Sequence, residues 1–111
     1  MRNITHFIDG AAVPGTSGRF GDIFNPNTGE VQARVALATA GELDAAVQSG
    51  LRGQQVWALV NPQRRARVMF DFKRLVEANM AELAEMLSSE HGKVIADSRG
   101  DVQRGLEVIE F

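Results

Sequence analysis

The sequence predicts an α+β fold in which a small antiparallel sheet of three or four short strands precedes about four amphipathic helices. Two observations carry this prediction. Residues 1–38 contain short apolar runs that are separated by turn residues, as short strands are. Residues 39–111 contain apolar residues at the three- and four-residue spacing of helices. We therefore expect one domain over residues 1–111, with a strand and turn region followed by a helical region.

Composition excludes several classes of protein. The 111 residues are 44% hydrophobic and 23% charged, which is typical of a globular chain rather than a disordered one. A net charge of −2 argues against a nucleic-acid partner. No apolar run approaches the ~18 residues of a membrane span. Without cysteine or a visible secretory leader, we expect a cytoplasmic protein with no disulfide and no thiol nucleophile in these residues.

Turn residues define the strands of the first region. Asp9-Gly10 separates Phe7-Ile8 from Ala11–Val13 and favours a two-residue hairpin turn. Asp22–Phe24 reads as a third strand, and Glu30–Val35 alternates polar and apolar residues as a half-buried strand does. These runs predict a single small sheet, which needs helices to cover it.

Three glycines precede the third predicted strand, at Gly15, Gly18 and Gly21. Their spacing is not that of the dinucleotide-binding fingerprint, and they do not join a strand to a helix. We interpret them as a flexible surface loop rather than a phosphate site.

Capping residues mark the helices. Thr39 and Glu42 form a capping box, and Asn61-Pro62 supplies an N-cap followed by a proline suited to the first turn. Asn79 is expected to cap a third helix, and Gly92 to end it. A fourth helix follows with one inward face, formed by Ile95, Ser98, Val102, Leu106 and Ile109.

Other helical residues indicate packing partners. Trp57 is expected to anchor the core. Glycines within the helices lower helix propensity and suggest close packing against another backbone; they are Gly50, Gly53, Gly100 and Gly105. The last residues, Val108–Phe111, contain no helix stop signal. We therefore expect an incomplete domain whose partners are the remainder of the same polypeptide or other copies of the chain. A stand-alone helical module that self-associates is the alternative.

Residue patterns alone identify no active site. His6 and His91 belong to no metal-binding motif, and no serine has a recognisable base beside it. Arg64, Arg65 and Arg67 lie at a helix start, where cations oppose the helix dipole. We interpret these arginines as an ion-paired surface in preference to a phosphate or cofactor contact. No catalytic, cofactor-binding or metal-binding residue is assigned.

An ordered set of landmarks resembles the N-terminal part of aldehyde dehydrogenases and covers essentially the whole chain. The final stretch, which contains Asp101-Val102-Gln103-Arg104-Gly105, is similar to the CoA-acylating methylmalonate-semialdehyde dehydrogenases of that family. The earlier landmarks are Phe7–Gly10, Asn25–Val31, Ala46-Val47, Trp57, Arg64–Ala66 and Glu90–Lys93.

This resemblance implies that the chain is the N-terminal part of an α/β NAD-binding domain. The complete enzyme would oxidise methylmalonate or malonate semialdehyde with NAD and CoA, yielding propanoyl-CoA or acetyl-CoA and CO₂, and would be a homo-oligomer. Another aldehyde dehydrogenase branch is the alternative within enzymes. The family's cysteine nucleophile and main NAD contacts lie C-terminal to residue 111. The isolated chain is therefore expected to be inactive and to bind neither cofactor tightly.

The resemblance also assigns one site residue. Arg104 occupies the family position that binds the carboxylate of the semialdehyde acid, a task suited to a guanidinium. The alternative is a helix-surface ion pair between Arg104 and Asp101 or Glu107.

Overall fold

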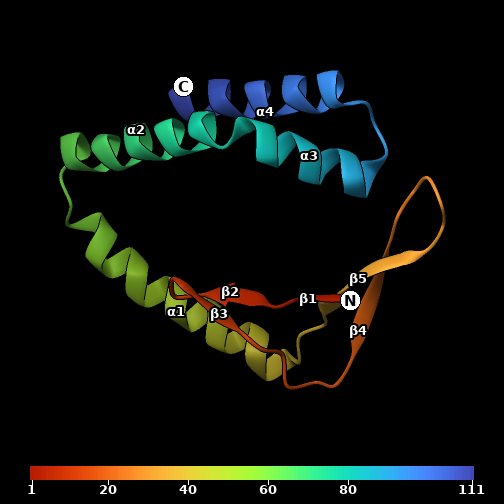
Figure 1. Ribbon diagram of the computed structural model, residues 1–111. Coiled ribbons are helices and arrows are strands. Elements are labelled where there is room, and N and C mark those ends of the chain that lie inside the picture. Colours follow the sequence, from red (N-terminus) through yellow and green to blue (C-terminus); the bar gives the residue numbers. More distant parts are fainter. The chain divides into compact units, whose positions relative to one another are not determined.

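A computed structural model describes residues 1–111 as five strands followed by four helices (Figure 1). This order confirms the predicted α+β class. The chain divides into two compact units, which are described separately below. The first comprises Met1–Phe24 and Gly29–Leu59, and the second comprises Asn25–Thr28 and Val60–Phe111. None of the four helices is both long and apolar enough to cross a membrane.

The first unit begins with a short strand and then the predicted hairpin. Strand β1 spans Arg2–Ile4, and β2 (His6–Ile8) pairs antiparallel with β3 (Ala11–Val13). Asp9 has φ 53° and Gly10 has φ 74°. Two central residues with positive φ are what a type I′ turn requires, so the Asp-Gly prediction is confirmed.

The other strands of this unit form a second sheet in the order β1-β5-β4. Strand β4 (Phe20–Phe24) runs antiparallel to β5 (Val31–Ala36), whereas β1 runs parallel to β5. The strands thus form two sheets instead of the single antiparallel one expected. A parallel pair needs a long connection, so no local turn signal could reveal it. The central strand buries Ala33 and Ala36.

Helix α1 (Ala40–Ala58) starts at the predicted capping box. Thr39 Oγ1 accepts from the Glu42 amide at 3.1 Å, and Glu42 Oε2 accepts from the Thr39 amide at 2.7 Å. The helix buries none of its residues. Trp57 is 41% exposed, so the expectation that it anchors the core is wrong for these 111 residues.

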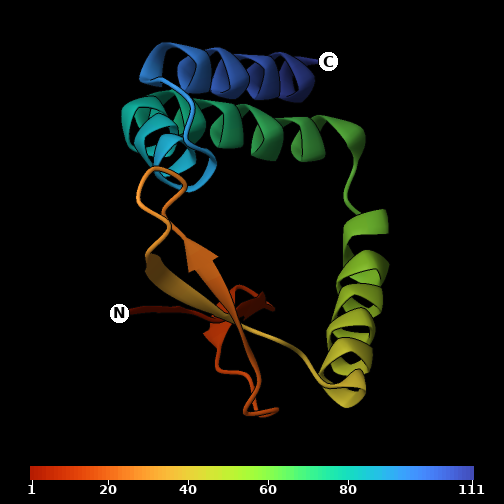
Figure 2. The ribbon, with the colours of Figure 1, turned by 90° about the vertical axis from the view of Figure 1, so that its right-hand side faces the viewer.

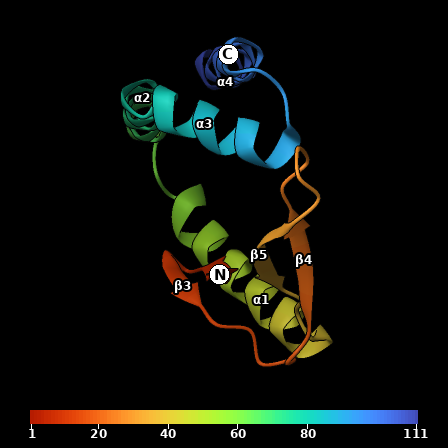
Figure 3. The same cartoon turned by 45° about the vertical axis from the view of Figure 1, so that its right-hand side comes forward.

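The second unit contains α2 (Pro62–Ala78), α3 (Met80–His91) and α4 (Ile95–Glu110). Helix α4 packs along both α2 and α3 (Figure 2). Figure 3 views α2 and α4 nearly along their axes, with α3 beside them. The interior of the unit contains Ala84 of α3 with Ser98 and Leu106 of α4. Ser98 and Leu106 therefore confirm the centre of the predicted inward face. Val102 and Ile109 are half-buried, whereas Ile95, at the start of the helix, is exposed, so its predicted place on that face is wrong.

In the second unit, the helix caps agree with the sequence at two of three positions. Asn61 caps α2 by accepting from the Arg64 amide at 2.9 Å, and Gly92 ends α3 with φ 85°. Asn79 stands before α3 but does not cap it. Its Nδ2 instead donates to the Leu75 carbonyl at 2.7 Å, so the side chain caps the C-terminus of α2. The two helices follow each other directly, and Asn79 is the residue between them.

The helix-interior glycines face open space. A Cβ added at Gly50, Gly53, Gly100 or Gly105 would meet no non-local atom within 4 Å. The backbone neighbour expected at these glycines is therefore not supplied by residues 1–111.

Candidate functional site

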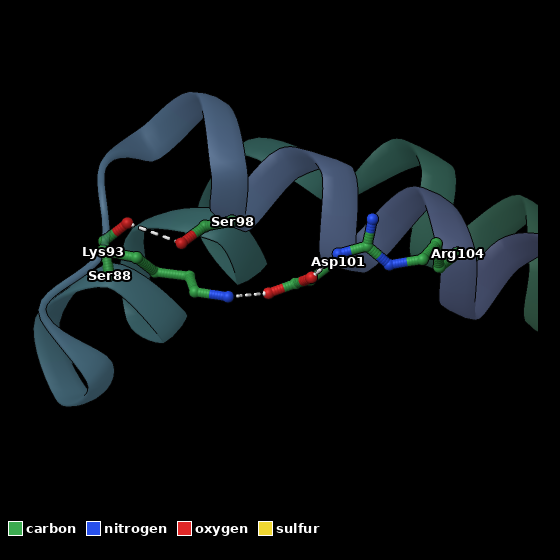
Figure 4. Close-up of polar contacts among 5 residues, drawn as sticks. All are labelled: Ser88, Lys93, Ser98, Asp101 and Arg104. Atoms are coloured by element: carbon green, nitrogen blue, oxygen red, sulfur yellow. Dashed lines mark hydrogen bonds and ion pairs between the residues drawn. The ribbon is translucent and has the colours of Figure 1, made fainter.

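Arg104, the residue to which the family resemblance assigns substrate binding, lies on α4 in the second unit (Figure 4). Its side chain is 70% exposed. Helical spacing places it on the same side of α4 as Asp101, three residues earlier. The guanidinium is thus accessible to a ligand while it stays in contact with a fixed carboxylate.

Asp101 links Arg104 to Lys93. Its Oδ1 accepts a hydrogen bond from Arg104 Nη2, and its Oδ2 accepts from Lys93 Nζ. Lys93 and Asp101 are each 26% exposed, far less than Arg104. We call Lys93, Asp101 and Arg104 the α4 charge cluster. The hydrogen bond from Lys93, followed by that from Arg104, lowers the pKa of the Asp101 carboxyl.

Two contacts fix the segment that carries Lys93. Ser98 is fully buried, and its hydroxyl is 2.7 Å from that of Ser88, which joins the start of α4 to α3 (Figure 4). Just before Lys93, the left-handed Gly92 lies against Pro26; a Cβ built on this glycine would be 3.0 Å from Pro26 Cγ. The α3–α4 connection is therefore held on both sides of the lysine.

The cluster can bind an anion although Arg104 is already paired. The structure shows the ion pair with Asp101 and none with Glu107. This pair engages only Nη2 of the guanidinium, a group that carries five N–H donors. The remaining donors can hold a carboxylate in a bidentate manner. The surface ion pair and the carboxylate-binding role are thus compatible.

The family resemblance assigned Arg104, but no role was predicted for Lys93. Asp101 and Arg104 are three residues apart on one helix, so helical spacing indicates their contact. Lys93 lies before the helix, and its contact depends on how the α3–α4 connection turns back along α4. The sequence offered two signals, the position of Lys93 directly after Gly92 at a helix end and its place in the landmark Glu90–Lys93, but neither indicated its partner.

The other candidate residues form no site. No group of three or more histidine or acidic side chains could hold a metal ion. Arg64, Arg65 and Arg67 take part in none of the ion pairs of the structure, so the predicted ion-paired surface is not found there. The Nε atom of Arg65 is buried without a partner.

The residues present do not fit a dinucleotide cofactor. Gly15 and Gly18 lie in the connection between β3 and β4, and Gly21 lies within β4, so no helix begins at these glycines. A phosphate cradle of the dinucleotide type requires a glycine turn that leads from a strand into a helix.

Comparisons with known proteins agree on one family. The family model described as "Aldehyde dehydrogenase family" matches residues 13–111. Curated malonate-semialdehyde dehydrogenases from Listeria monocytogenes serotype 4a (strain HCC23) and Geobacillus kaustophilus (strain HTA426) are 39% and 42% identical to this chain. The matches cover 100% and 99% of this chain, respectively, and 23% of each relative.

Solved structures give the same result. A provisionally named methylmalonate-semialdehyde dehydrogenase from Sinorhizobium meliloti 1021, complexed with NAD, is 60% identical with a TM-score of 0.97. The methylmalonate-semialdehyde dehydrogenase from Oceanimonas doudoroffii is 36% identical with a TM-score of 0.95. The first match covers 100% of this chain and 23% of that structure, and the second covers 99% and 22%. The chain thus spans less than a quarter of these relatives.

Proposed function

Because the chain belongs to the aldehyde dehydrogenase family, we propose that it forms part of an NAD-dependent enzyme that oxidises methylmalonate or malonate semialdehyde. The names of its relatives support this substrate class. In the proposed reaction NAD takes the hydride of the aldehyde, the substrate carboxylate leaves as CO₂, and CoA accepts the remaining acyl group, which gives propanoyl-CoA or acetyl-CoA. NAD and CoA bind to parts of the enzyme outside residues 1–111.

The observation that carries the proposal is the exposure and hydrogen bonding of the Arg104 guanidinium. Its guanidinium is mostly exposed, and one N–H is directed to Asp101 while the others are available. Both proposed substrates carry a carboxylate in addition to the aldehyde. A planar guanidinium can donate two parallel hydrogen bonds to such a group and so fix its orientation.

The role of this chain is to bind and orient the substrate. Arg104 holds the acid end, so the aldehyde end points to a nucleophile that another part of the enzyme supplies. No residue of this chain can serve as that nucleophile in a thiol mechanism, because the chain contains no cysteine. Holding the acid end improves the alignment of the aldehyde and so contributes to the rate.

The test compares two substrates that differ only in the carboxylate. In the complete enzyme that contains these residues, Arg104→Ala should lower kcat/KM for methylmalonate semialdehyde by about 10- to 150-fold, the loss of one charge-assisted hydrogen-bonded contact. The value for propanal should change much less. Arg104→Lys should recover part of the loss, because an ammonium keeps the charge but not the planar fork. Steady-state kinetics with both aldehydes measure these effects.

Three results would overturn the proposal. One is a wild-type enzyme that does not oxidise semialdehyde acids. Another is an equal loss with both aldehydes in Arg104→Ala, which would remove Arg104 from carboxylate recognition. The third is a coding sequence that supplies no cysteine nucleophile beyond Phe111.

A further inference from the structure

We propose that Lys93 is a positioning residue that makes the α4 charge cluster selective for an aldehyde with one carboxylate. This inference rests on the proposed function, because it concerns how Arg104 recognises the same acid group. Lys93 does not touch the substrate in this proposal. It acts through Asp101, and the argument has a geometric part and an electrostatic part.

The geometric part concerns the orientation of the Arg104 guanidinium. An exposed arginine has many accessible rotamers, and holding one of them costs conformational entropy. Asp101 restrains Arg104 through Nη2, and Lys93 restrains Asp101 through the other carboxylate oxygen. Because the lysine is held by the α3–α4 connection, it fixes the carboxylate from outside helix α4. Arg104 is therefore oriented before the substrate arrives.

The electrostatic part concerns competition for the guanidinium. Alone, Asp101 would neutralise Arg104 and repel an incoming carboxylate. Lys93 offsets that negative charge, so the three side chains together carry one net positive charge. A substrate with one carboxylate neutralises this charge, whereas an uncharged aldehyde gains nothing from it.

These two parts give Lys93 and Asp101 different expected effects. Removing the lysine charge leaves the Asp101–Arg104 contact in place but makes the pair neutral. Removing the carboxylate charge frees Arg104 while the local charge becomes more positive. A lysine that only stabilised the fold would not distinguish substrates by their charge.

The experiment uses the complete enzyme with methylmalonate semialdehyde and propanal. We expect Lys93→Met to raise KM for the acid by about three- to tenfold, the effect of one unit charge a few ångströms away under partial solvent screening, with little change for propanal. Lys93→Arg should restore the KM, because it returns a cation to Asp101. Asp101→Asn should reduce kcat/KM for the acid less than Arg104→Ala does, because the charge on Arg104 remains.

Lys73 provides a matched control in the same unit. Its side chain is 24% exposed, close to the 26% of Lys93, and its ammonium pairs with Glu77 and Glu110. Lys73→Met should therefore cost a similar amount of stability without changing the ratio of the two KM values. Thermal unfolding of each variant checks that the stability losses match.

The possible outcomes separate this inference from the proposed function. If Arg104→Ala selectively impairs the acid but Lys93→Met alters both substrates equally, or neither, Lys93 is not a positioning residue and the proposed function stands. If Arg104→Ala impairs both substrates equally, the proposed function fails, and this inference fails with it. An acid-specific rise in KM in Lys93→Met that Lys93→Arg reverses, and that Lys73→Met lacks, supports the inference.

Discussion

Glu42 joins two parts of the first unit with a single carboxylate. One oxygen accepts from the Thr39 amide in the capping box, and the other accepts from the Thr16 amide at 2.6 Å and the Thr16 hydroxyl at 2.9 Å. The Thr39 amide, followed by the Thr16 amide, lowers the pKa of Glu42 to about 2. The ionised carboxylate is thus the form that holds the β3–β4 connection to the start of α1.

This pKa predicts an acid-sensitive first unit. A carboxyl whose pKa is lower in the folded state stabilises the fold above its ordinary pKa of 4.5, and it loses that contribution as the pH falls toward 2. Glu42→Gln should reduce stability at pH 7 and flatten the pH dependence between these limits. Urea unfolding of the chain, followed by circular dichroism at several pH values, measures both effects.

Glu82→Gln is the control for this experiment. Glu82 also lies in the first turn of a helix, α3, but forms no capping box there. If Glu82→Gln lowers stability and flattens its pH dependence as much as Glu42→Gln does, the hydrogen bonds of Glu42 are not the cause of the acid sensitivity.

At the residue scale, local contacts could be predicted and contacts across a connection could not. The Thr39–Glu42 box follows from residues three apart, and so does the Arg104–Asp101 pair that the sequence offers as an alternative. The bonds from Thr16 to Glu42 and from Lys93 to Asp101 depend on how loops return to a helix. No spacing rule encodes such a return.

Two glycines of the second unit differ in position, because one ends a helix and the other lies inside a helix. Gly92 ends α3 with φ 85° and lies against Pro26, whereas Gly100 is inside α4 and faces open space. A side chain at the first position meets both backbone strain and a close neighbour. At the second it meets neither, and alanine has the higher helix propensity.

Alanine substitutions at these glycines should therefore change stability in opposite directions. Gly92→Ala should destabilise the chain by about 1–2 kcal/mol, the cost of placing a Cβ in the left-handed region. Gly100→Ala should stabilise it by about 0.5–1 kcal/mol. Urea midpoints of the two variants and the wild type test this. A loss of stability in Gly100→Ala would place a close neighbour at that position.

Secondary structure was predictable where side-chain chemistry acts over a few residues. Asp9-Gly10 and Asn61 each satisfy a nearby backbone requirement, and the structure confirms both. Asn79 was misassigned because an asparagine between two adjoining helices can serve either one, and only the fold decides which. Strand β1 was missed because its partner is β5, far along the chain.

At the scale of the whole molecule, both units leave much apolar surface in contact with solvent. Helices α1 and α2 contain no buried residue. Large exposed side chains lie in both units, including Phe7, Leu43, Val56, Leu59, Phe70, Val108 and Phe111. Monomeric globular proteins rarely expose contiguous apolar patches beyond a few hundred Å². Trp57 could not be identified as exposed from sequence, since its helical spacing resembles that of a core residue.

We expect the 111-residue chain by itself to associate with other copies or to bind a hydrophobic dye. Both responses reduce the exposed apolar area, which is the main favourable term in protein association. Sedimentation velocity over a range of concentrations, with fluorescence of anilinonaphthalene sulfonate, provides the measurement. A monodisperse monomer that does not increase the fluorescence of the dye would contradict the expectation.

The parallel pairing of β1 with β5 has a consequence for the order of events during synthesis. Arg2–Ile4 emerges from the ribosome before its partner Val31–Ala36, which must be translated before the pair can form. The hairpin β2–β3 has no such delay, because its partners are joined by two residues. Strand β1 is therefore translated before the hairpin, yet its own partner becomes available only after both strands of the hairpin have been made.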